Sequence, residues 1–116
     1  MSPHLSDDMK AAIEACQACH EACMETTAKL RMRGPGDNGQ IGALLDCAEV
    51  CRLAANFLTR DSPLHAMACA LCADACQRAA RDCARVDDDD VRRTADTCRR
   101  TGDRCRRLAA GAVAMM

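Results

Sequence analysis

The chain has 116 residues, which suits a single domain, and its formal net charge is −1 because 16 Lys and Arg nearly balance 17 Asp and Glu. It has no Trp or Tyr and a single Phe, which argues against modules that stack nucleic-acid bases on aromatic side chains. No apolar run approaches the ~18 residues of a membrane span, and no export signal opens the chain. We therefore expect a cytoplasmic protein with neither nucleic-acid nor membrane partners.

Cysteine is an unusually large part of the apolar composition. Leu, Ile, Val and Phe supply only 16 residues, whereas 23 residues are Ala and 11 are Cys. A core of Ala and Leu alone would be thin, so we expect the cysteines to lie in the interior. In the cytoplasm thiols are kept reduced, and a cysteine-rich chain there binds metal more often than it forms disulfides.

Breaker residues divide the chain into four helices, predicted at about 6–33, 40–60, 63–86 and 88–112. Ser6 is the expected N-cap of the first helix, residues 34–39 form a loop, and Pro63 occupies the first position of the third helix. The Asp87 to Asp90 run precedes and supports the fourth. Four helices of similar length with short connections predict an all-α, antiparallel up-down-up-down bundle, with residues 1–116 as one domain.

The cysteines recur at heptad spacings on all four predicted helices. The first helix carries them at i, i+3 and i+7, and the third repeats this pattern and adds one a heptad later. Residues at these spacings share one stripe of a helix and face the bundle axis. The sequence therefore predicts one interior column of thiols: Cys16, Cys19, Cys23, Cys47, Cys51, Cys69, Cys72, Cys76, Cys83, Cys98 and Cys105.

Metal binding explains such a column better than packing or disulfides do. Packing accounts for one or two buried cysteines rather than 11, and neighbours on one rigid helix are poorly directed for an S–S bond. Thiols one turn apart suit Cu(I), a soft ion that thiolates select, so we predict storage of several Cu(I) ions per chain without enzymatic activity. A thiol-based redox or sensor protein and a zinc-binding structural bundle remain the alternatives.

Two further residues suggest where copper enters the bundle. In an up-down bundle the start of the first helix adjoins the start of the third, which places Met9 and His65 at the same end. One hypothesis is that their thioether and imidazole receive incoming copper. An equal alternative is that Met9 fills the core and that His65 is a partly exposed residue at a helix start.

The whole pattern resembles the bacterial copper storage proteins, and in particular their cytosolic branch. The resemblance is most specific at Asp61-Ser-Pro63 leading into Cys69-Ala-Leu-Cys72-Ala-Asp-Ala-Cys76, and at the Cys16-x2-Cys19-x3-Cys23 opening. It implies a homotetramer of four-helix bundles that stores many Cu(I) ions, with all 11 cysteines as ligands. Positions that could hold further thiols are occupied here by Ala80, Val91, Ala95 and Gly102, so the capacity should not exceed roughly one Cu(I) per cysteine.

Overall fold

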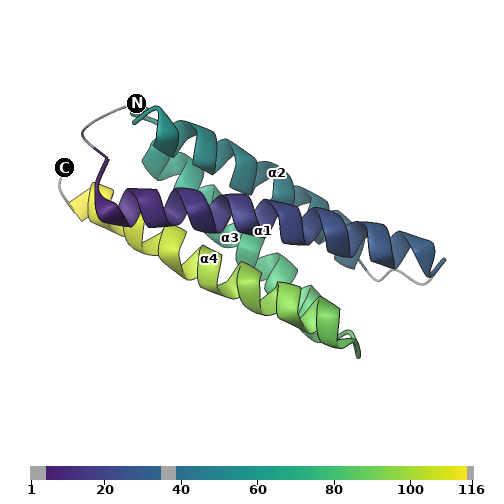
Figure 1. Ribbon diagram of the computed structural model, residues 1–116. Helices are drawn as coiled ribbons and strands as arrows, with labels where there is room; N and C mark the ends of the chain where they lie inside the picture. The colour runs from purple at the N-terminus through teal and green to yellow at the C-terminus, as the bar shows by residue number, and fades with distance from the viewer. Residues whose placement is uncertain (1–4, 35–38, 115–116) are drawn as a thin grey trace.

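A computed structural model describes residues 5–34 and 39–114 of the chain, which form a bundle of four helices. These are α1 (Asp7–Met32), α2 (Gln40–Thr59), α3 (His65–Ala84) and α4 (Asp89–Ala114), and no strand occurs in the two described ranges. Successive helices run in opposite directions, and α4 returns to pack against α1 (Figure 1). The molecule measures 46 × 25 × 19 Å, and its architecture confirms the predicted antiparallel bundle.

The ends of α1 follow from local capping. The Ser6 hydroxyl oxygen accepts a hydrogen bond from the Met9 N–H at 3.1 Å, which satisfies one of the free amides of the first turn. After the helix, Gly34 takes the left-handed φ of 86° that commonly ends helices and that glycine tolerates best. Residues 35–38, which belong to the predicted loop, lie outside the described part of the chain.

Helix α3 begins at His65, two residues later than the predicted start at Pro63. The Ser62 hydroxyl accepts a hydrogen bond from the Leu64 N–H at 3.1 Å, and the Ser62 carbonyl accepts one from the His65 N–H at 3.0 Å. These bonds close a turn that contains Pro63, so the proline lies before the helix rather than within its first turn. Helix α4 starts at Asp89, one residue later than expected, and continues beyond the predicted residue 112 to Ala114.

The interior of the bundle consists mainly of Cys and Ala side chains. All 11 cysteines are fully buried, and Leu44, Leu58 and Val91 are the largest apolar side chains among the fully buried residues. Small side chains let the helices approach closely, which keeps the sulfur atoms of opposite helices within contact. Among the described helices, none is long and apolar enough to cross a bilayer.

Candidate metal centre

The cysteine sulfurs from the four helices meet along the bundle axis. The Sγ atoms of Cys16 and Cys105 lie 3.5 Å apart across α1 and α4, and those of Cys51 and Cys72 lie 3.6 Å apart across α2 and α3. Cys47 is the most connected, because its Sγ lies 3.5–4.0 Å from four other thiols: Cys19, Cys51, Cys76 and Cys98. The heptad prediction of an inward thiol column is therefore realised in the packing.

Nine of the sulfurs fall into three groups that are compact enough to hold a metal ion. Within each group all Sγ atoms lie within 4.8 Å of one another, and every member is buried. The groups are Cys19, Cys47, Cys51 and Cys76; Cys19, Cys23, Cys47 and Cys98; and Cys16, Cys72 and Cys105. The first two share Cys19 and Cys47, and contacts between Cys72 and both Cys51 and Cys76 join the third group to them.

The two remaining cysteines, Cys69 and Cys83, are buried but belong to none of these groups. Cys69 lies three residues before Cys72, toward the start of α3, and so extends the column in that direction. A hydrogen bond from Cys105 lowers the pKa of its thiol. Cys83 lies toward the opposite end of α3. The structure thus brings nine of the predicted thiols into shared groups, places Cys69 beside them, and leaves Cys83 outside the groups.

Neighbouring thiols in the column shift one another's pKa in opposite directions. The largest cause of the lowered pKa of Cys19 is a hydrogen bond from Cys23. The largest cause of the raised pKa of Cys51 is a hydrogen bond to Cys16. Burial adds to every rise, because it disfavours the charged form. A buried cluster can support one thiolate with S–H donors but resists a second negative charge beside it. The pKa is raised for Cys23, Cys51, Cys76, Cys98 and Cys105.

At the end of the bundle where α1 and α3 finish, toward which Cys83 also lies, hydroxyl groups take the place of thiols on α1 and α4. The side-chain oxygens of Thr26 and Thr94 form a buried hydrogen bond of 2.7 Å between α1 and α4. Thr26 lies one heptad after Cys19, so this layer occupies the same stripe as the thiols. The heptad pattern could have located this layer, which was not among the predicted site residues.

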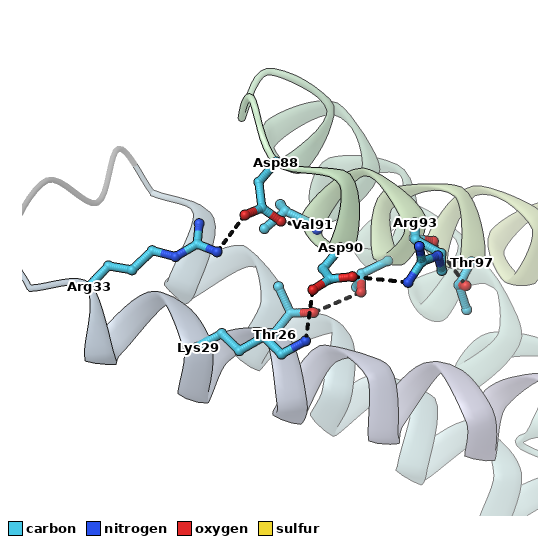
Figure 2. Close-up of polar contacts among 9 residues, drawn as sticks. Thr26, Lys29, Arg33, Asp88, Asp90, Val91, Arg93 and Thr97 are labelled. Carbon is cyan, nitrogen blue, oxygen red and sulfur yellow. Dashed lines mark hydrogen bonds and ion pairs between the residues drawn. The ribbon is translucent and has the colours of Figure 1, made fainter.

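Ion pairs cover this hydroxyl layer on the outside (Figure 2). Lys29 pairs with Asp90 at 3.1 Å, and Arg33 pairs with Asp88. Asp88 also accepts a hydrogen bond from the Val91 N–H at 3.0 Å, and this bond, followed by Arg33, holds the pKa of its carboxyl below the usual range. Together these contacts tie the end of α1 to the start of α4 and place charged groups over that end of the column.

The opposite end carries the two residues proposed to receive copper. Met9 is half-buried and packs against the core, and His65 is half-buried at the first position of α3. The ring Nδ1 of His65 lies 2.8 Å from the Ser62 carbonyl, which can only accept, so Nδ1 carries the proton. In this tautomer of the neutral ring, Nε2 is the nitrogen whose lone pair can bind a metal. His20 shows the same arrangement mid-helix, with Nδ1 at 2.7 Å from the Ala48 carbonyl.

The fold and the site together define a four-helix bundle whose core is lined with thiols. A sequence model described as "copper storage protein" matches residues 3–110. The chain therefore belongs to the copper storage protein family.

Solved structures show the same fold over nearly the whole chain. Cu(I)-bound copper storage protein BsCsp3 is 32% identical, with a TM-score of 0.83 over 89% of this chain and 99% of that one. Apo copper storage protein 3 from Bacillus subtilis is 34% identical, with a TM-score of 0.82 over 86% and 97% of the two chains. A Nitrosospira multiformis protein, Nmul_A1745, is 26% identical with a TM-score of 0.81, covering 89% and 95%.

A curated relative matches a shorter stretch of sequence. The uncharacterized cysteine-rich protein YhjQ of Bacillus subtilis is 37% identical over 67 residues. That alignment spans 56% of this chain and 62% of the relative's length.

Proposed function

We propose that this protein stores Cu(I) as thiolate complexes along the axis of its bundle, with the 11 cysteines as ligands. The observation that carries the proposal is the continuity of the column: nine buried sulfurs form groups within 4.8 Å, and the groups are joined through shared or contacting thiols. Soft sulfur ligands select Cu(I), and a thiolate with metals on either side can bridge them. Family membership and the Cu(I)-bound relative support the same conclusion.

Charge balance favours a monovalent ion as the stored metal. Each cysteine that loses its proton leaves one negative charge in the core, and no Lys or Arg among the described residues is buried there to compensate it. One Cu(I) per thiolate keeps the column neutral. Loading of this kind replaces each thiol proton with a copper ion and releases the proton to solvent.

Copper reaches the column through the end that carries Met9 and His65. At the other end, Cys83 is fully buried, and the groups nearer the surface, the Thr26–Thr94 hydrogen bond and the Lys29–Asp90 ion pair, offer oxygen and nitrogen atoms that are hard or already occupied. At the Met9 end, a thioether and a free imidazole nitrogen are available, and Cys69 extends the column toward them. Metal-binding histidines usually donate the N–H of their second ring nitrogen to a carbonyl or carboxylate, and His65 has this arrangement, with Nδ1 bonded to the Ser62 carbonyl.

The biological setting follows from the same proposal. A store needs ligands and no open catalytic position, and we assign this chain no enzymatic activity. A cytoplasmic location fits thiols that must stay reduced, and none of the 11 cysteines, all of which lie in the described ranges, forms a disulfide. The family resemblance leads us to propose a homotetramer, in which each bundle holds its own copper.

Anaerobic titration of the reduced protein with Cu(I), against a chromophoric chelator that reports free metal, tests this function. Storage requires uptake of about ten ions per chain before the chelator gains colour. Saturation at two or three ions would refute storage. Reversible oxidation of a few thiols with no copper retained would instead favour the redox or sensor alternative.

A further inference from the structure

The middle of the column also has a geometry that suits four-coordinate divalent metals. Two four-sulfur groups lie side by side there and share the pair Cys19 and Cys47. Cys51 and Cys76 complete one group, and Cys23 and Cys98 complete the other. Six thiols therefore form two four-sulfur groups that share one pair, with members from all four helices.

The sulfur separations agree with tetrahedral coordination. A tetrahedron built on metal–sulfur bonds of about 2.3 Å has edges of about 3.8 Å. The shared edge Cys19–Cys47 measures 3.9 Å. In the first group Cys51–Cys76 measures 3.8 Å, and in the second Cys19–Cys98 measures 3.7 Å and Cys23–Cys98 3.6 Å.

We propose that, when copper is absent, this part of the column binds two divalent d10 cations, Zn(II) or Cd(II), as an edge-sharing pair bridged by Cys19 and Cys47. Each metal has four buried thiolate ligands and no open position, which is the form of a closed structural site. Binding converts six thiols and two cations into a complex of charge −2 and releases six protons. This site is separate from the proposed copper loading, and either can fail without the other.

Sharing the two thiolates limits the charge that the core must hold. Two separate four-thiolate sites would carry −4, whereas the shared pair carries −2. Even this charge has no buried Lys or Arg beside it among the described residues. Divalent ions are therefore confined to the central pair, while Cu(I), which leaves no net charge, can occupy the whole column and displace them.

The test uses ¹¹³Cd(II) as the probe, added to the reduced full chain in copper-free buffer and followed by ¹¹³Cd NMR. We expect two resonances in the tetrathiolate region, each split by the other through the shared sulfurs. Resonances without mutual splitting, or no tetrathiolate resonance at all, would overturn the proposal. Because this readout uses the wild-type protein, it does not depend on whether a variant folds.

Variants then locate the bridge. Cys47→Ser should abolish the splitting and reduce tightly held cadmium in the middle of the column from two ions to one. Cys69→Ser is the matched control, because Cys69 is equally buried but lies outside the six thiols, and it should keep the split pair. Loss of splitting in the control, or its survival in folded Cys47→Ser, would contradict the assignment. Circular dichroism establishes that each variant folds.

Zn(II) is tested in competition with a chromophoric zinc chelator. The wild-type protein should hold two Zn(II) ions per chain, and subsequent Cu(I) should release both as its own uptake proceeds. Retention of fewer than two Zn(II) ions by a protein that shows the split cadmium pair would exclude zinc as a natural ligand of this site.

Discussion

Gly102 of α4 lies directly against Cys76 of α3. A Cβ atom placed on Gly102 would lie 3.0 Å from the Cβ of Cys76 and 3.3 Å from the carbonyl oxygen of Ala73. The missing side chain therefore lets α3 and α4 approach closely at the middle of the thiol column. This approach helps to hold Cys76 and Cys98 within reach of Cys47, at 3.5 and 3.9 Å.

Replacing this glycine should destabilise the apo bundle. Gly102→Ala gains up to about 1 kcal/mol of helix propensity, but crowding a packed core costs about 1–3 kcal/mol, and the nearest atoms belong to backbone and Cβ rather than to a flexible tip. We expect a net loss of about 1 kcal/mol in the free energy of unfolding, measured by urea denaturation of the reduced protein. Gly42→Ala is the control: Gly42 is exposed in α2 with nothing within 4 Å, so the same change should stabilise. Equal effects at the two positions would contradict the close approach.

Gly102 also illustrates what the sequence could and could not reveal. The heptad period correctly indicated that this position faces the core, because a straight helix repeats its inward stripe almost every seven residues. The sequence suggested that a thiol could stand there. Only the distance between α3 and α4 shows that the space is taken by Cys76 and Ala73, and such distances depend on the packing of all four helices.

In the candidate site, too, some features could be predicted from the sequence and others depend on how the helices pack. Which cysteines face inward followed from spacing alone, whereas the grouping of their sulfurs depends on the relative height and rotation of the helices. Cys83 continues the heptad of α3 yet lies outside the compact groups. The start of α3 differed from the prediction because hydrogen bonds to Ser62 close a turn around Pro63, a local alternative to the first helical turn.

Variants at the Met9 end should slow copper uptake without lowering its capacity. Met9→Leu removes a soft sulfur while keeping the volume, and His65→Gln removes the free ring nitrogen. We expect the stopped-flow rate of Cu(I) uptake to fall several-fold in the double variant, with the final stoichiometry unchanged. His20→Gln is the control, since His20 has a similar hydrogen bond but lies mid-helix. An unchanged rate in the double variant would argue that copper enters elsewhere.

Copper loading should release protons and weaken as the pH falls. Hydrogen bonds to neighbouring thiols raise the pKa of Cys51 and Cys76 above the ordinary 9.0. The largest contribution comes from Cys16 for Cys51 and from Cys19 for Cys76. These thiols are therefore protonated at neutral pH and must lose their protons to bind metal. We expect proton release on loading in weakly buffered solution, and a lower apparent affinity at about pH 6 than at about pH 8. Copper binding without proton release would contradict the pKa directions.

The same shifts predict the alkaline limit of the apo protein. A folded pKa above the unfolded value means that the unfolded chain loses its proton first as the pH rises. The stability that Cys51 and Cys76 contribute is thus complete below about pH 9 and is lost as the pH rises toward their folded pKa. Urea midpoints of the reduced protein should decline above that pH. The copper-loaded protein should resist this decline, because its thiolates are already paired with metal.

The hydroxyl layer formed by Thr26 and Thr94 should behave as a coupled pair. Thr26 and Thr94 share a buried hydrogen bond of 2.7 Å, so Thr26→Val or Thr94→Val alone leaves one buried hydroxyl without that partner. Each single variant should lose about 1–3 kcal/mol of unfolding free energy, the usual cost of an unsatisfied buried polar group.

Changing both residues together should recover much of that loss. The Thr26→Val/Thr94→Val protein has two apolar side chains of nearly the original shape, an exchange that can be nearly neutral. The double-mutant cycle, measured by urea denaturation of reduced apoprotein, should therefore give a coupling energy of about 1 kcal/mol or more. Additive losses would mean that the two hydroxyls act independently. The folded double variant also tests the path of copper. If copper does not enter at this end, the variant should take up Cu(I) at the wild-type rate. Faster uptake would show that the hydroxyl layer had been controlling an opening.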